Sequence, residues 1–187
     1  MRNVSTRLLM SCAAIGVAGG VVFTVNAYIG GAVSNLLPLV YGLTIGLYFI
    51  PGALAQALFR RPWVGLFTSA LAGLVASPFQ PIAFGAFLIG VGIGVLQELP
   101  FLVVRYRRWP AWLFLVGSGF AGLVMTAAAF RILGGGDYDL LGTVLLIGSF
   151  FISPPLCTML AVWLAKQLER AGIGRDLRLA EDRRARR

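Results

Sequence analysis

Histidine is absent from this sequence, and acidic side chains are scarce, with 7 Asp and Glu residues against 16 Lys and Arg residues. Histidine is the commonest general base and a common metal ligand, so its absence excludes Ser–His and HExxH sites. The sequence also lacks the GxxxxGK[ST] loop that binds nucleotide phosphates. We therefore expect no catalytic residues, no cofactor and no ATPase site in this chain.

Only two cysteines are present, Cys12 and Cys157, and both lie within apolar segments without CxxC spacing. Isolated cysteines of this kind are typical of small buried apolar residues rather than of disulfides or metal sites. Together with the missing histidine, they predict that the chain holds no metal ion.

Charged residues make up only 12% of the 187 residues, whereas hydrophobic residues make up 58%. Soluble proteins carry about 25% charged residues. This composition, with a mean hydropathy of +0.85, therefore predicts a multi-pass protein of the cell (inner) membrane. The net charge of +9 does not indicate nucleic-acid binding, because most basic residues stand in short connections or in the C-terminal tail.

Six apolar segments predict an all-α integral membrane fold, a bundle of six transmembrane helices. All but the third reach the ~17–25 residues that a membrane-crossing helix needs. The short third segment ends in Ser77-Pro78-Phe79-Gln80-Pro81, whose prolines cannot continue a regular helix. Such a short helix is tolerated only where its freed backbone is buried in protein or lines a cavity. The expected segments are 8–25, 36–58, 64–76, 82–104, 111–132 and 140–165.

The distribution of basic residues predicts that both termini are cytoplasmic. Basic residues precede the first segment, separate the second from the third and the fourth from the fifth, and recur in the tail. The connections 26–35, 77–81 and 133–139 carry none, and Arg131 is the exception. We expect a six-helix membrane domain over residues 1–168 and a charged cytoplasmic tail over 169–187. The apolar run 8–25 is longer than a typical signal-peptide core, which favours an uncleaved first span.

Glu98 is the first acidic residue of the chain and lies inside the fourth apolar segment. An ionisable group at membrane depth is costly and is usually functional or paired. Two interpretations stay open. Glu98 either pairs with an arginine such as Arg105, or it faces the bundle interior and binds a ligand or carries a proton.

Polar aromatic residues form a stripe in the second segment, where Tyr41, Thr44 and Tyr48 stand at helical spacing. The stripe either bonds to other helices or forms one wall of a ligand pocket.

The first segment carries two small-xxx-small pairs, Ala14/Ala18 and Gly16/Gly20. Small residues four apart let another helix approach closely. The pairs serve either packing inside the bundle or docking of a separate membrane subunit.

Several motifs, in this order, resemble the YkoE family. Its members are substrate-binding S components of energy-coupling factor (ECF) transporters associated with thiamine and its hydroxymethylpyrimidine precursor. The motifs are GLYFI at 46–50, RRP at 60–62, the short third helix ending near Ser77, the Glu98 helix leading into RYRRW at 105–109, and LAKQLERAG at 164–172. The resemblance implies a subunit that captures a vitamin from outside. It would work with a transmembrane coupling (T) subunit and ATP-binding cassette ATPases supplied by other chains.

The resemblance also implies roles for individual residues. The family's aromatic residue in the second helix falls on Tyr48 and its intramembrane acid on Glu98, whereas Ser69 stands where the family often carries an acid. Small residues that dock the coupling subunit match Ala14 and Ala18. The loop 77–81 contributes if it dips into the bundle. The candidate substrate-binding residues are Glu98, Tyr48, Tyr41, Thr44 and Gln80.

Two other functions stay open. One is a membrane scaffold or assembly protein that uses its small-residue faces and binds no small molecule. The other is a self-sufficient ion-coupled transporter, which the few ionisable residues within the spans disfavour.

Overall fold

A computed structural model describes residues 6–107, 109–132 and 139–172, and within these ranges the chain is helical without strands. Five helical stretches are long and apolar enough to cross a membrane, and a sixth, Val64–Phe79, is shorter. Arg2, Arg108, Asp137 and most of the tail lie outside the described residues. The elements are α1 (Thr6–Leu36), η1 (Pro38–Val40), α2 (Gly42–Ile45), η2 (Gly46–Phe49), α3 (Ile50–Phe59), α4 (Val64–Ala76), η3 (Ser77–Phe79), α5 (Gly85–Val103), α6 (Ala111–Ile132) and α7 (Leu140–Arg170).

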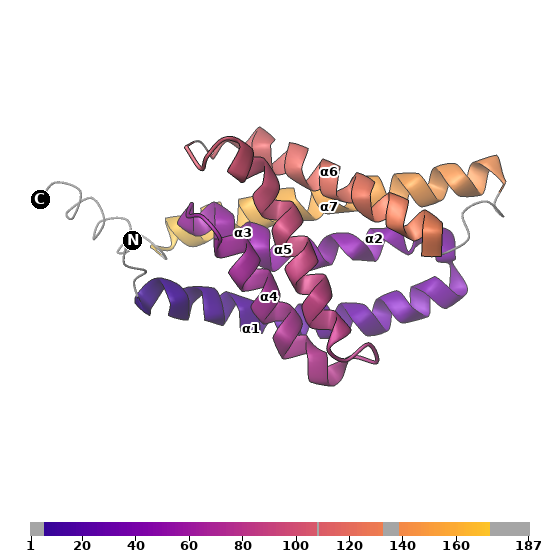
Figure 1. The fold of residues 1–187 in the computed structure, drawn as a ribbon, viewed down its shortest axis with the longest axis horizontal. Helices are drawn as coiled ribbons and strands as arrows, with labels where there is room; N and C mark the ends of the chain where they lie inside the picture. Colours follow the sequence, from indigo (N-terminus) through magenta and orange to yellow (C-terminus); the bar gives the residue numbers. More distant parts are fainter. Residues whose placement is uncertain (1–5, 108, 133–138, 173–187) are drawn as a thin grey trace, which may run out of the picture.

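The long helices α1, α6 and α7 run along the long axis of the molecule, and the α4–α5 hairpin crosses them obliquely (Figure 1). The start of α1, the turns after α3 and α5, and the end of α7 lie toward one end of the molecule (Figure 1). We call this the basic end, because the turn after α3 carries Arg60 and Arg61 and the turn after α5 carries Arg105 and Arg107. The turn between α1 and α2 lies at the opposite end (Figure 1).

Two segments match their expected bounds, because the structure has helices over Val64–Ala76 and Ala111–Ile132. The first helix is longer than expected and continues from Val25 through the expected connection to Leu36. Its last turn is closed by the side chains of Ser34 and Asn35, which both donate to the carbonyl of Gly31 at 2.9 Å. The sixth is also longer, since α7 ends at Arg170.

The second expected helix is broken in the structure into η1, α2, η2 and α3. Two serines of α7 bind its backbone: Ser149 donates to the carbonyl of Leu39 at 3.1 Å, and Ser153 donates to the carbonyl of Leu43 at 2.6 Å. Ser153 also accepts from the amide of Gly46 at 3.0 Å. Where a membrane helix departs from the regular α-helical bonding pattern, its backbone needs such partners, because lipid supplies none.

The two small-residue pairs of α1 face different surroundings. Gly16 and Gly20 are buried against α4, where a Cβ atom on either residue would approach Leu71 or Val75 within 2.8 Å or 2.6 Å. Ala14 and Ala18 are exposed on the other side of the helix. The glycine pair therefore serves packing inside the bundle.

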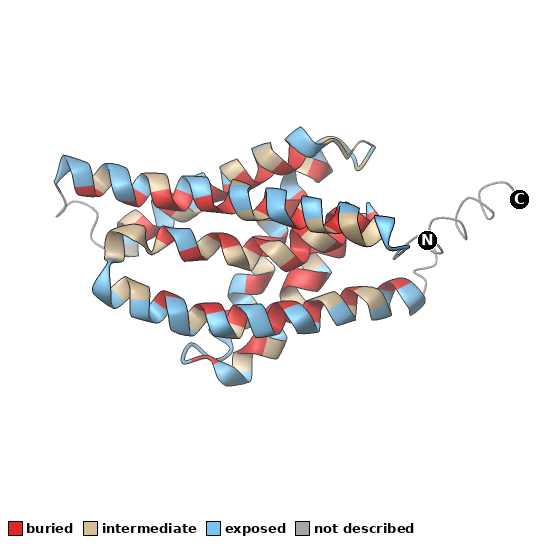
Figure 2. Ribbon diagram, turned by 180° about the vertical axis from the view of Figure 1, so that it is seen from behind, coloured by how far each residue is buried: buried red, intermediate tan, exposed pale blue. Residues whose placement is uncertain are grey.

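Burial is concentrated where α3, α4 and α5 meet the long helices, and the outward faces of α1, α6 and α7 are largely exposed (Figure 2). These exposed faces carry large apolar side chains, among them Val21, Phe120 and Leu141. A surface of this composition suits a lipid environment, in agreement with the multi-pass membrane protein expected from the sequence.

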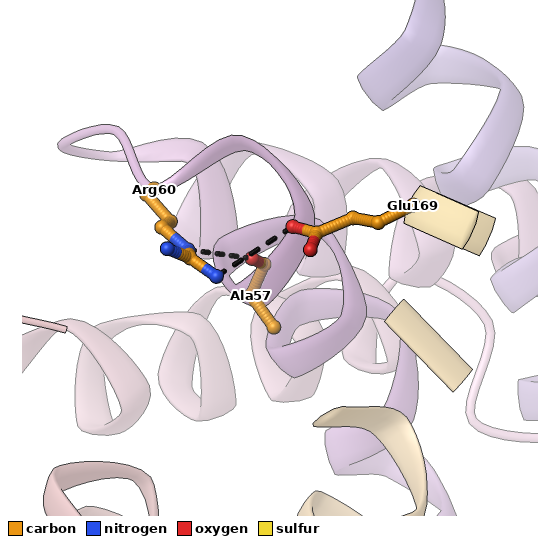
Figure 3. A network of polar contacts seen from close by, with 3 residues as sticks. All are labelled: Ala57, Arg60 and Glu169. Carbon is orange, nitrogen blue, oxygen red and sulfur yellow. Dashed lines mark hydrogen bonds and ion pairs between the residues drawn. The ribbon is translucent and has the colours of Figure 1, made fainter. Parts of the chain in front are cut away.

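One ion pair joins the basic ends of two helices. Arg60 ends α3 in a left-handed conformation with φ 49°, and its guanidinium lies 3.6 Å from a carboxylate oxygen of Glu169 in the last turn of α7 (Figure 3). The Arg60 Nε also donates to the carbonyl of Ala57 at 3.4 Å (Figure 3). Because half-exposed ion pairs contribute little to stability, we regard this contact as a minor tie between α3 and α7.

Candidate functional site

Five residues from three parts of the chain meet between α1, the broken second span and the turn after η3. We call Phe23, Asn26, Thr44, Tyr48 and Gln80 the Asn26 group. Asn26 is the central member: it is only 2% exposed, and its Nδ2 donates to the carbonyl of Thr44 at 2.9 Å. The Oδ1 atom of the same amide is buried and has no hydrogen-bond partner.

The aromatic part of the group consists of Phe23 and Tyr48. Their ring centroids lie 4.7 Å apart with an interplanar angle of 78°, an edge-to-face contact. The Gln80 side chain is buried, and its Nε2 donates to the carbonyl of Phe23 at 3.0 Å. A second bond, from the hydroxyl of Tyr28 to the carbonyl of Phe79 at 2.8 Å, holds the same turn against α1. The turn after η3 thus places a polar side chain inside the bundle.

Tyr41 and Thr44 lie beside this group. A Cβ atom on Gly30 of α1 would lie 3.1 Å from the Tyr41 ring and 3.3 Å from the Thr44 hydroxyl, so both side chains rest against α1 at a residue without a side chain. Tyr41 also packs against Phe150 of α7, with ring centroids 5.9 Å apart. The structure therefore brings four of the five candidate substrate-binding residues into one neighbourhood.

The fifth candidate, Glu98, lies elsewhere. Its side chain is fully buried, and its Oε1 accepts from the amides of Gly65 at 2.9 Å and Leu66 at 3.4 Å. These amides belong to the first turn of α4, whereas Gln80 follows the opposite end of that helix. Because 13 residues of helix span about 20 Å, the structure does not bring Glu98 together with the Asn26 group.

Glu98 completes the start of α4. The residue that precedes the helix, Trp63, has φ 67° and supplies no side-chain cap, so the first amides of α4 lack a local acceptor. An acidic group suits this position because the N-terminus of a helix carries a partial positive charge. The second oxygen, Oε2, accepts from the Tyr106 hydroxyl at 2.8 Å. One carboxyl group therefore links the start of α4 to the turn after α5.

The surroundings of Tyr106 affect both the pKa of its phenol and its backbone conformation. Burial and the hydrogen bond to the neighbouring Glu98 carboxyl both raise the pKa of the Tyr106 phenol above its ordinary value. Tyr106 and its neighbour Arg105 have positive φ angles of 56° and 53°, which non-glycine residues adopt only when their surroundings hold them. The bond to Glu98 supplies such a restraint.

Sequence reasoning missed two residues that the structure places in the site, Phe23 and Asn26, and a third buried polar residue, Gln97, that bonds to the second span. The Gln97 amide donates to the carbonyl of Phe49 at 2.7 Å and accepts from the Ser69 hydroxyl at 3.3 Å. A signal for Gln97 exists in the sequence, since it is an uncharged amide inside an apolar segment. Asn26 had no such signal, because it stood just beyond the expected end of the first span.

The described residues offer no cluster for a metal ion. No group of three or more Cys, Asp, Glu or His side chains comes together among them. Transition metals in proteins are often bound by imidazole and thiolate ligands, yet the chain has no histidine and its two cysteines form no disulfide. The Asn26 group offers amide, hydroxyl and phenol side chains, which can donate and accept hydrogen bonds.

An apolar groove runs along the exposed side of α1. It has a volume of about 340 Å³ and includes Ala14 and Ala18 on α1 and Ile50, Pro51 and Leu54 on the facing side. The small side chains of the two alanines leave this part of the groove open. The structure therefore places the candidate docking residues at a surface recess whose lining includes no member of the Asn26 group.

Comparisons with known proteins bear on this architecture. Residues 8–124 match the model of a family described as "ABC-type cobalt transport system, permease component". A solved structure described as "Crystal structure of an S-component of ECF transporter" superposes with a TM-score of 0.78, covers 98% of each chain and is 18% identical in sequence. At this identity the likeness concerns the fold. No curated protein matches the sequence.

Proposed function

The chain belongs to the family of permease components of ABC-type cobalt transport systems, and from this membership we propose that it is the S component of an ECF transporter. Its ligand is thiamine or the hydroxymethylpyrimidine precursor of thiamine, captured from outside for ATP-driven uptake. The observation that carries the proposal is the fold shared with an S component over 98% of both chains. A coupling subunit and ATPase subunits on other chains would complete the transporter.

The orientation follows from charge. The basic end carries Arg60, Arg61, Arg105 and Arg107, and by the positive-inside rule this end faces the cytoplasm. The start of α1 and the end of α7 lie toward the same end (Figure 1), so both termini would be cytoplasmic. The turn between α1 and α2 would then face outward.

We assign ligand contact to the Asn26 group and Tyr41. Half-buried aromatic rings beside buried amides are the usual lining of a small-molecule site. Glu98 uses both of its oxygens on protein donors, so in this proposal it holds α4 and the turn with Tyr106 rather than touching the ligand directly.

The family description favours a second ligand, cobalt. The donor set argues against it, because the chain has no histidine and the described residues form no acidic or thiol cluster. An organic heterocycle fits the hydrogen-bonding and aromatic side chains better. The two ligands are separated by one experiment.

The experiment is a fluorescence titration of the purified chain in detergent, using its own tryptophans, with thiamine, hydroxymethylpyrimidine and Co²⁺ in parallel. Saturable binding of a pyrimidine compound and no response to Co²⁺ is the expected result. Tyr48→Ala should weaken this binding at least about tenfold, because an aromatic contact is lost. Saturable binding of Co²⁺ alone would replace the vitamin by cobalt, and no binding of any ligand would favour a scaffold.

The groove at Ala14 and Ala18 is proposed as the docking surface for the coupling subunit. Leucine at both positions should fill the groove and abolish co-purification with that subunit while leaving ligand affinity unchanged. Val21→Leu is the matched control, because Val21 is exposed on the same helix outside the groove. Unchanged co-purification of the Ala14→Leu/Ala18→Leu variant would remove this surface from the proposal.

A further inference from the structure

The unpaired oxygen of Asn26 is the starting point. Buried polar atoms in folded proteins nearly always have a hydrogen-bond partner, and each exception calls for an explanation. Among the described residues, Asn26 Oδ1 is such an exception in a side chain that is 2% exposed. It lies among residues that sequence reasoning had independently selected for ligand binding, including Thr44 and Tyr48.

The orientation of the Asn26 amide is fixed by its other end. Nδ2 donates to the carbonyl of Thr44 at 2.9 Å. If the amide turned over, its oxygen would face this carbonyl, and two acceptors would oppose each other. Asn26 therefore presents an acceptor, and no donor, to whatever enters the group.

The neighbouring donors do not bond to Asn26 Oδ1. The Gln80 amide nitrogen is already bound to the carbonyl of Phe23. The Tyr48 phenol lies near enough to interact with the Asn26 amide, yet Oδ1 accepts no hydrogen bond. The acceptor thus stands beside the edge-to-face pair of Phe23 and Tyr48. Tyr48 is half-buried, whereas Asn26 is only 2% exposed.

We propose that Asn26 selects ligands that carry an N–H donor on a flat aromatic heterocycle. The donor would bond to Oδ1 while the ring packs against Tyr48 and Phe23. A ligand with an acceptor at that place would leave Oδ1 buried against a second acceptor, which a site of this kind rejects. The inference rests on the proposed function and narrows it, because both thiamine and hydroxymethylpyrimidine carry an amino group on a pyrimidine ring.

The test combines a protein variant with a ligand analogue. Thiamine and oxythiamine differ at the pyrimidine, where oxythiamine has an oxygen in place of the amino group. In the parent chain, thiamine should bind at least about tenfold more tightly than oxythiamine, since one donor is lost and one acceptor is left unpaired. In Asn26→Leu the preference should fall to about threefold or less, mainly through weaker binding of thiamine.

Two further variants keep the result interpretable. Asn26→Asp retains the acceptor while giving up the bond to Thr44, so it should keep the preference for thiamine even if stability falls. Asn35→Leu changes the same residue type on the same helix at an exposed position, and it should leave both affinities unchanged. Calorimetric titration in detergent, after a check of monodispersity by gel filtration, measures all four proteins.

The outcomes separate the two proposals. Binding of thiamine by the parent with an equal preference in parent and Asn26→Leu would overturn the role of Asn26 and leave the proposed function in place. A parent that binds neither thiamine nor hydroxymethylpyrimidine would overturn the proposed ligand class together with this inference. Loss of the preference in Asn26→Asp would show that the Thr44 bond, and not the acceptor, carries the selection.

Discussion

Replacing Glu98 by alanine should destabilise the protein without removing its ligand site. The Glu98 carboxyl is fully buried and accepts three hydrogen bonds, from Gly65, Leu66 and Tyr106. Its loss leaves the amides of Gly65 and Leu66 and the hydroxyl proton of Tyr106 without their carboxylate acceptor. Removing one member of such a buried arrangement costs about 3–5 kcal/mol.

The size of the effect should follow the number of bonds removed. Tyr106→Phe removes one bond and should cost about 1–2 kcal/mol. Glu98→Gln keeps an oxygen for the α4 amides and should fall between Tyr106→Phe and Glu98→Ala. At about 2–4 °C per kcal/mol for a chain of this size, Glu98→Ala should lower the Tm by roughly 6–20 °C.

The assay is thermal unfolding of the purified variants in detergent, followed by tryptophan fluorescence, together with ligand titration well below the Tm. We expect a graded loss of Tm and a ligand affinity within about threefold of the parent. A Glu98→Ala protein with the parental Tm and no ligand binding would refute the reasoning, because it would make Glu98 a ligand contact and not a cap of α4.

Three further predictions concern stability. Burial and the neighbouring Glu98 raise the pKa of Tyr106 in the folded protein. The stabilisation that the protonated phenol provides is therefore complete below the unfolded pKa of about 10 and is lost as the pH rises above it. The Tm of the parent should fall faster between pH 9 and 11 than the Tm of Tyr106→Phe. Ser153→Ala should lower stability by about 2 kcal/mol, measured as a Tm shift, because it removes the hydrogen bonds that Ser153 makes with the Leu43 carbonyl and the Gly46 amide. Thr158→Val should stabilise the protein by about 1 kcal/mol and raise its Tm by a few degrees, since the Thr158 hydroxyl is buried without a hydrogen-bond partner. A lower Tm would indicate that a water molecule binds this hydroxyl in the small cavity beside it.

The sequence was most informative where an element is determined by local residues. Helix α4 begins and ends as expected, because Arg60, Arg61 and Pro62 precede it and Pro78 follows it. Helix α6 likewise follows Pro110, and the sequence after it continues with three glycines at 134–136. Apolar runs bounded by charge, proline and glycine define such helices without reference to the rest of the fold.

The length of α1, the irregular second span and the partners of Glu98 depend on tertiary contacts, which the sequence did not reveal. The first helix continues past Asn26 to Leu36, and the side-chain Nδ2 of Asn26 donates to the carbonyl of Thr44, which is distant in sequence. The second span departs from a regular α-helix where serines of α7 donate hydrogen bonds to its carbonyl groups. The local sequence of the span does not indicate these partners. Glu98 left two interpretations open for the same reason: its partners are amides of α4 and the phenol of Tyr106, which sequence spacing alone does not bring together.

ATP-driven uptake of labelled thiamine into proteoliposomes is the measurement that tests the central claim most directly. The vesicles would contain a coupling subunit and ATPases with or without this chain, and in a third set this chain alone. The proposal predicts uptake only when all components and ATP are present. Uptake by the chain alone would make it a self-sufficient transporter, and equal uptake with and without the chain would contradict its role as the substrate-binding subunit.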